Sequence, residues 1–175
     1  MIMIQIQKII SGGQTGVDQA ALRAAIASGI PIDGWCPPGH ICEDGIIPEE
    51  FPLKETPFEK SEEAPDLPRS LRTEWNVRDS DGILILTKSI ASLDPGTNFA
   101  RQCCLHYNNP YTIEDPSDPL SLARSRKWIE ANSIAVLNVA GPSEKTEPGI
   151  GQLVYIFLMH LLSHARSNLK SLQSQ

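Results

Sequence analysis

Residues 11–18 (SGGQTGVD) constrain the fold of this chain more than any other segment. They follow an apolar, β-branched run at residues 2–10 and precede an alanine-rich stretch at residues 19–28. The order of strand, glycine turn and helix is how α/β proteins build a loop that binds anions, because glycine lets backbone N–H groups approach a ligand closely. The N-terminus of the following helix favours negative charge. The segment therefore predicts a strand–turn–helix unit with an anion-binding turn.

The glycine turn does not match the standard phosphate-binding fingerprints. Its glycines stand at positions 12, 13 and 16, which does not fit the dinucleotide pattern G-x-G-x-x-G. No Lys-Ser or Lys-Thr pair follows Gly16, so the Walker pattern is absent as well. An ordinary tight turn between strand and helix therefore stays open as the alternative.

Length and charge narrow the class of protein. A chain of 175 residues is long enough for one domain with its own core, and we expect a single domain over residues 1–175. A net charge of −6 argues against a general binder of nucleic acid or anionic membranes. The apolar start lacks a basic region and a cleavage site, and the apolar stretch at 153–162 is too short to span a bilayer. We expect a cytoplasmic protein without nucleic-acid or membrane partners.

Strand and helix patterns alternate along the chain. We predict strands at 4–11, 30–36, 82–88, 111–113 and 134–139, and helices at 14–28, 70–79, 97–108, 119–131 and 149–167. This alternation predicts an α/β fold with a mainly parallel sheet that helices cover on both faces. Residues 37–68 are rich in proline and interrupt the alternation, so we expect an ordered excursion or a partly mobile loop there.

Glycine-bearing turns follow three of the predicted strands, and the carboxyl ends of parallel strands meet at one edge of a sheet, where ligands bind. The turns contain Gly12-Gly13, Gly96-Thr97 and Gly141-Pro142. Asn138 ends a buried strand, so its amide needs a hydrogen bond to backbone or ligand. From these turns we predict a ligand-binding set of Gly12, Gly13, Gln14, Thr15, Gly16, Gly96, Thr97, Asn138, Gly141, Pro142 and Ser143.

A polar cluster precedes the strand at 82–88. A guanidinium group there could pair with a phosphate through two parallel hydrogen bonds. Alternatively, pairing between an arginine of this cluster and Asp79 holds the connection from helix to strand. We add to the ligand-binding set the residues Arg72, Asn76, Arg78 and Ser80.

Five segments together resemble a known family. They are SGGQTGVDQAAL, GWCPPGHICEDGIIP, RTEWNVRDSDG, the GT pair at 96–97, and LNVAGPSE. The chain is similar in these segments to the "putative molybdenum carrier" proteins, a YpsA-like branch of the Rossmann-like superfamily that includes the lonely-guy phosphoribohydrolases and DprA. The resemblance implies a three-layer α/β/α Rossmann-like fold and self-association as a dimer or tetramer. It also implies a phosphorylated nucleotide-like or pterin-like ligand, such as the molybdenum cofactor (molybdopterin).

The chain departs from these relatives at the second turn. It has Pro95-Gly96-Thr97 where relatives usually have Gly-Gly-Thr, and residues 98–100 hold no carboxylate, whereas the phosphoribohydrolases place a catalytic glutamate shortly after this turn. We therefore predict a binding or carrier protein. The alternative is a hydrolase that acts on nucleoside monophosphates, for which the candidate acids or bases are Asp18, Asp79 and Glu43.

Three further features each have a structural and a functional interpretation. Asp18 stands in the first turn of a helix, where a carboxylate either offsets the helix dipole or contacts the ligand. Cys36, His40 and Cys42 match no standard zinc spacing, and we assign no metal site. The last helix is apolar nearly all round, which predicts a buried helix that also forms a subunit interface in a homo-oligomer.

Overall fold

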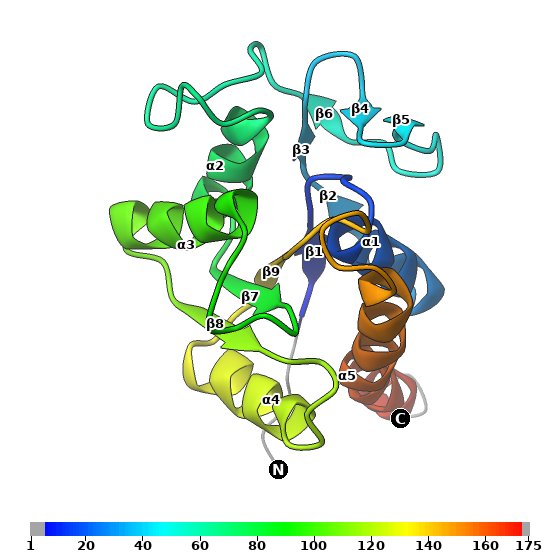
Figure 1. Cartoon of the computed structure of the whole chain (residues 1–175). Helices are drawn as coiled ribbons and strands as arrows, with labels where there is room; N and C mark the ends of the chain where they lie inside the picture. Colours follow the sequence, from blue (N-terminus) through cyan, green and yellow to red (C-terminus); the bar gives the residue numbers. More distant parts are fainter. Residues whose placement is uncertain (1–5, 173–175) are drawn as a thin grey trace.

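A parallel sheet of five strands forms the centre of the computed structural model, which describes residues 6–172, with side chains for residues 6–163 (Figure 1). Its strands lie in the order β2-β1-β9-β7-β8. The last strand in the sequence thus lies between the first and the third strand of this sheet, and the carboxyl ends of β1, β9 and β7 meet at one edge. The strands are β1 (Lys8–Ile10), β2 (Ile32–Asp33), β7 (Gly82–Leu86), β8 (Tyr111–Glu114) and β9 (Val136–Ala140).

Helices cover both faces of the sheet, which confirms the predicted three-layer Rossmann-like fold (Figure 1). One face packs against α1 (Val17–Ala27), α4 (Ser121–Ala131) and α5 (Ile150–Leu172), and the other against α2 (Ser70–Arg78) and α3 (Pro95–Tyr107). Side chains alternate along β7, because successive residues of a strand point to opposite faces. Leu84 and Leu86 join the core beside α1 and α5, while Ile83 and Ile85 join the core beside α2 and α3.

The predicted strand at 30–36 is wrong as one element, because the chain turns at Gly34. Gly34 has a φ of +145°, and a Cβ there would lie 2.1 Å from the carbonyl oxygen of Ser11. The chain therefore leaves the central sheet after β2 and enters a small parallel sheet of β3 (Trp35–Cys36) and β6 (Lys54–Glu55). The start of the first predicted strand, at residues 4 and 5, lies outside the described residues.

The proline-rich excursion at 37–68 is ordered and packs against α1. It contains a short antiparallel hairpin of β4 (Ile41–Cys42) and β5 (Gly45–Ile46), followed by β6. Phe51, Ile47 and Leu53 of the excursion form a buried cluster with Leu22 of α1. Apolar burial thus fixes a segment whose prolines leave it little regular backbone hydrogen bonding.

Four of the five predicted helices begin or end two or more positions from the expected residue. Helix α1 begins at Val17 instead of residue 14, α4 begins at Ser121 instead of residue 119, and α5 ends at Leu172 instead of residue 167. Helix α3 starts at Pro95, two positions before the predicted start, because Asp94 caps it. Helix α5 buries Val154, Leu158 and Leu161 against the sheet and α1. Within residues 6–172, no helix is both long enough and apolar enough to cross a membrane.

Candidate functional site

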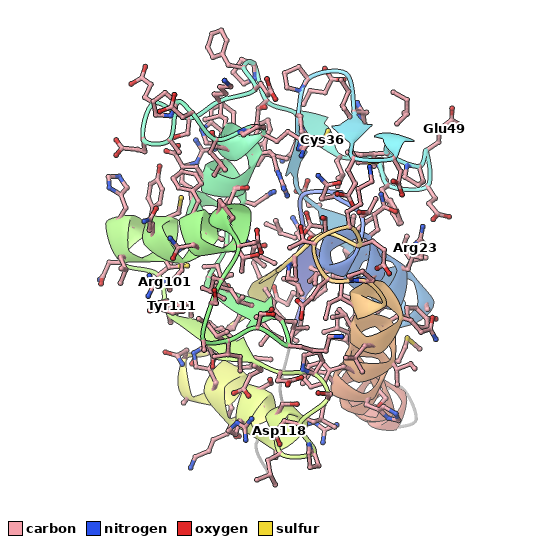
Figure 2. All side chains as sticks on the ribbon, in the orientation of Figure 1. Arg23, Cys36, Glu49, Arg101, Tyr111 and Asp118 are labelled. Carbon is pink, nitrogen blue, oxygen red and sulfur yellow. The ribbon has the colours of Figure 1, made fainter. Side chains whose placement is uncertain are left out.

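A cavity of about 260 Å³ lies at the carboxyl edge of the central sheet. Its walls are the glycine turn after β1, the end of β9 with the loop that follows it, the N-terminal parts of α2 and α3, and the β4–β5 turn and last residues of the excursion. Arg23 and Arg101 lie on opposite flanks of the molecule, and neither lines the cavity (Figure 2). Of the predicted site residues, the cavity lining contains Gly12, Gln14, Asp18, Glu43, Arg72, Asn76, Gly96, Thr97, Asn138, Gly141 and Ser143.

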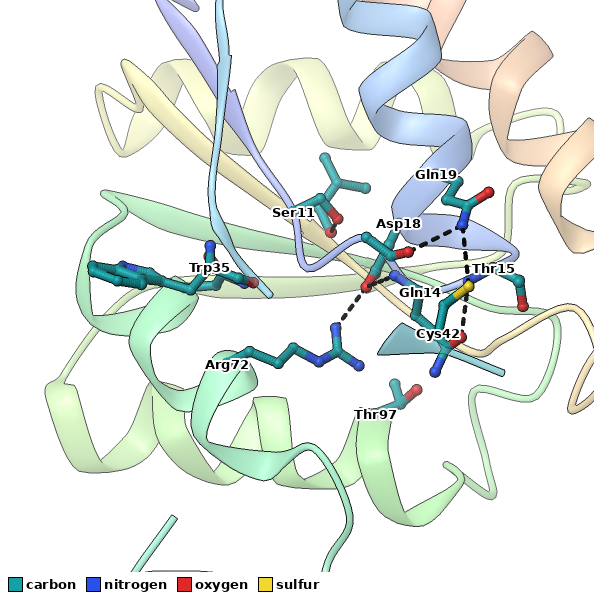
Figure 3. A network of polar contacts seen from close by, with 12 residues as sticks. Ser11, Gln14, Thr15, Asp18, Gln19, Trp35, Cys42, Arg72 and Thr97 are labelled. Atoms are coloured by element: carbon teal, nitrogen blue, oxygen red, sulfur yellow. Dashed lines mark hydrogen bonds and ion pairs between the residues drawn. The ribbon is translucent and has the colours of Figure 1, made fainter. Parts of the chain in front are cut away.

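A buried ion pair crosses the floor of this cavity. The Arg72 side chain reaches from α2, and its Nη1 lies 2.6 Å from Oδ2 of Asp18 on α1 (Figure 3). The side chains are 17% and 4% exposed, respectively. A Cβ at position 12 would lie 2.0 Å from Arg72 Nη1, so Gly12 is needed for the arginine to pass. The first glycine of the turn thus serves this ion pair.

Burial and pairing act on Asp18 in opposite directions. Burial raises the pKa of the Asp18 carboxyl above its ordinary value, while Arg72 and the amide of Gln14, 3.2 Å away, oppose that rise. Arg72 keeps a hydrogen-bond donor without a partner, because its buried Nε bonds to no residue in the described part of the chain. Asp18 therefore positions a cavity arginine, which goes beyond offsetting a helix dipole.

Thr15 joins three separate segments. Its hydroxyl donates to the Glu43 carboxylate of the excursion and accepts from the amide of Glu144, 3.2 Å away. Partial burial raises the pKa of Glu43, but hydrogen bonds from Thr15 and from the Lys145 amide, 3.0 Å away, outweigh it and hold the pKa below its ordinary value. Thr15 therefore ties the excursion and the loop after β9 to the glycine turn, and it does not line the cavity.

The start of α3 already carries a carboxylate. Asp94 Oδ1 accepts hydrogen bonds from the amides of Gly96, at 3.1 Å, and Thr97, at 3.2 Å. The predicted second anion-binding turn is thus a helix cap that the chain's own side chain fills. An aspartate followed by a proline at the first helical position is a recognised start signal, which could have placed this helix correctly.

Two buried asparagines of the cavity differ in their partners. Asn76 holds the backbone of Trp35, accepting from its amide at 2.8 Å and donating to its carbonyl at 2.9 Å. Asn138 on β9 is only 3% exposed, and its side-chain amide makes no hydrogen bond to any described residue. It lines the cavity. The hydrogen bond that the sequence required of Asn138 is thus not made within the described chain.

Arg69 lines the cavity, although sequence analysis missed it. It stands just before α2 in a left-handed conformation, with a φ of +57°. Its guanidinium forms no hydrogen bond or ion pair with the described residues. No local pattern marks this arginine, which lies between the proline-rich excursion and a predicted helix.

Other predicted residues lie away from the cavity. Arg78 pairs with Asp79 at 2.7 Å, and Asp79 also accepts a hydrogen bond of 2.7 Å from the Trp35 indole. This supports the structural interpretation of that pair. The predicted residues outside the cavity lining are Gly13, Thr15, Gly16, Arg78, Asp79, Ser80 and Pro142.

The side chains of Cys36, His40 and Cys42 pack into different surroundings and do not meet at one point. Cys36 and Cys42 are buried in the cluster beside α1. His40 Nδ1 lies 2.6 Å from the Glu55 carboxylate, and its Nε2 lies 3.1 Å from the carbonyl of Leu53. Among the described residues, no group of three or more His, Cys, Asp or Glu side chains is placed to hold a metal ion.

Comparison with known proteins gives a family match over most of the chain. Residues 9–162 match the sequence model of the circularly permutated YpsA SLOG family. The crystal structure of a "putative molybdenum carrier protein" from Syntrophus aciditrophicus SB is 38% identical. That match covers 90% of this chain and 94% of the other, with a TM-score of 0.76. No curated protein matches the chain. A last strand inserted at the centre of the sheet agrees with a permuted order of elements.

Proposed function

Because the chain belongs to the circularly permutated YpsA SLOG family, we propose that its cavity binds a phosphorylated small molecule that is nucleotide-like or pterin-like. The molybdenum cofactor is one such ligand, and the name of the related solved structure supports it. The observation that carries the proposal is the presence of two cavity arginines, Arg69 and Arg72, with unused hydrogen-bond donors.

The arginines give the cavity its preference for an anion. A guanidinium carries five N–H donors in a planar fork that suits phosphate oxygens. One guanidinium nitrogen of Arg72 pairs with Asp18, and no guanidinium nitrogen of Arg69 pairs with a described residue. At about 260 Å³ the cavity lies just below the range of about 300–1,000 Å³ that is usual for small-molecule sites. A compact ligand with one phosphate therefore suits it better than a dinucleotide.

Binding of the ligand's phosphate would depend on side chains more than on the backbone amides of the three glycine turns. The amides of Gln14, Gly96 and Thr97 already donate to aspartates of the chain. The Thr15 amide donates to the side chain of Gln14, 3.0 Å away. Since these N–H groups are used, the phosphate would bind the guanidinium groups of Arg69 and Arg72.

The alternative, a hydrolase that acts on nucleoside monophosphates, gains less support. Of its three candidate carboxylates, Asp79 lies outside the cavity lining. Asp18 is held by Arg72, and Glu43 accepts from Thr15 and from the Lys145 amide. Self-association through α5 and a cytoplasmic location stay predictions.

Native mass spectrometry of the purified protein, followed by calorimetric titration with AMP, GMP, ribose 5-phosphate and a molybdopterin-containing extract, tests the proposal. We expect a co-purified phosphorylated compound or saturable binding of at least one probe. Arg69→Ala and Arg72→Met should each weaken that binding about tenfold or more, because a charge-assisted hydrogen bond contributes about 1.5–3 kcal/mol.

The matched control is Arg78→Ala, which removes an arginine of the same helix that does not line the cavity. Its affinity should equal that of the unmodified protein. Binding that survives Arg69→Ala and Arg72→Met unchanged, or no binding of any probe, would refute the proposal.

A further inference from the structure

Asn138 carries a side-chain amide that opens into the cavity and hydrogen-bonds to no described residue. It is 3% exposed, lines the cavity, and makes no side-chain hydrogen bond to the described residues. Its amide atoms are not sealed inside the protein but open into the cavity, where a water molecule or a ligand can pair with them. Asn138 thus points to a partner that enters the cavity.

The backbone holds Asn138 rigidly in place. It lies on the central strand β9, between Ile10 of β1 and Ile83 of β7, so strands hydrogen-bonded on both sides fix its position. Its neighbours Leu137 and Val139 face the core beside α1 and α5. Because strand residues alternate, Asn138 faces the α2–α3 side, where Arg72 also reaches into the cavity.

The chemistry of an amide side chain limits what this partner can be. A carboxamide has an N–H donor and a carbonyl acceptor side by side, so a phosphate, which offers only acceptors when ionised, leaves the carbonyl unpaired. A planar nitrogen heterocycle with an adjacent donor and acceptor satisfies both at once. Asparagine and glutamine pair with adenine in this way, which discriminates against a wrong base by about 1–3 kcal/mol.

We propose that Asn138 binds the heterocyclic end of the ligand through one donated and one accepted hydrogen bond, while Arg69 and Arg72 bind its phosphate. This inference rests on the proposed function, since it places the second half of the same ligand. It assigns the ligand to compounds whose ring presents a neighbouring donor and acceptor, as nucleobases and pterins do.

Two pairs of nucleotides that differ only at this ring edge test the inference by calorimetric titration. AMP is compared with purine riboside 5′-monophosphate, which lacks the amino group. GMP is compared with the same purine riboside 5′-monophosphate, which lacks the carbonyl, the ring N–H and the 2-amino group and so offers no neighbouring donor and acceptor. We expect the complete edge to bind about 5- to 150-fold more tightly in at least one pair.

Asn138→Leu should abolish this preference, because it keeps the side-chain size and removes both hydrogen-bonding atoms. Without ligand, its thermal midpoint should stay close to that of the unmodified protein, because no hydrogen bond to a described residue is lost. Asn138→Ala serves as a second variant with the same expected loss of preference. Asn132→Leu, at the exposed end of α4, is the control and should keep the preference.

Ribose 5-phosphate separates the two proposals, since it has the phosphate and no base. If it and the nucleotides bind through Arg69 and Arg72 but neither pair shows a preference, Asn138 does not read the base and this inference fails alone. A preference that persists in Asn138→Leu has the same consequence. If no phosphorylated probe binds, the proposed function and this inference both fail.

Discussion

Replacing Arg72 by methionine should destabilise the ligand-free protein strongly, because it removes the partner of a buried carboxylate. The Asp18 side chain is 4% exposed and lies 2.6 Å from Arg72 Nη1. Removing one member of a buried ion pair costs about 3–5 kcal/mol, since the remaining charge stays in a poorly solvated position. That is a large share of the total stability of about 5–15 kcal/mol that is usual for a folded protein.

The exposed pair on the same helix provides the matched control. The side chains of Arg78 and Asp79 are 38% and 36% exposed, so Arg78→Met should cost no more than about 1 kcal/mol. The double variant Asp18→Asn with Arg72→Met should regain most of the loss, because no unpaired charge remains. The free energy of unfolding would be measured by urea denaturation.

The loss in Arg72→Met should also depend on pH. Burial raises the pKa of Asp18 above its ordinary value of 3.8, and removing Arg72 removes an influence that lowers it. The folded variant therefore holds the Asp18 proton more tightly than the unfolded chain, so its stability falls as pH rises above 3.8 through the pKa of the folded state. A loss of about 1 kcal/mol or less at pH 7, equal to that of Arg78→Met, would refute this reasoning.

Two further predictions concern packing and thiol chemistry. Gly141→Ala places a Cβ 2.3 Å from the Leu86 carbonyl oxygen and should lower the free energy of unfolding, measured by thermal denaturation, by about 1–3 kcal/mol. The control Gly96→Ala, whose Cβ would have its nearest contact at an ordinary 3.4 Å, should be neutral or stabilising. Equal effects of the two variants would show that Gly141 is not needed for this close approach. Burial raises the pKa of Cys36 to about 11 and those of Cys103 and Cys104 to about 12, so these thiols should resist iodoacetamide at pH 8 until urea unfolds the chain, and rapid labelling of the native protein would contradict their burial.

The layers of the fold could be predicted from local sequence patterns. The runs GILIL and VLNVA are buried on both faces of a parallel sheet, and their apolar composition indicated this directly. The one strand predicted wrongly, at 30–36, breaks at Gly34 because the chain passes against the Ser11 carbonyl, a contact that no local pattern encodes.

The candidate site could be located from the sequence, but its internal pairing could not. Glycine turns after parallel strands indicated the edge of the sheet at which the cavity lies, because the carboxyl ends of such strands meet there. The partners of each polar group depend on tertiary packing. Arg72 meets Asp18 across 54 positions of sequence, and Gly12 is needed for that approach.

The sequence by itself therefore determined the α/β architecture, the family and the edge of the sheet that holds the cavity, since strand pattern and turn chemistry are local properties. Only the tertiary structure decided which donors stay available there. The Asp94 carboxylate accepts from the backbone amides at the start of α3, while the side-chain donors of Arg69 and Asn138 form no hydrogen bond to the described residues. Hydrogen-bond pairing is settled between segments far apart in the chain, and it is this pairing that distinguishes a filled turn from a binding site.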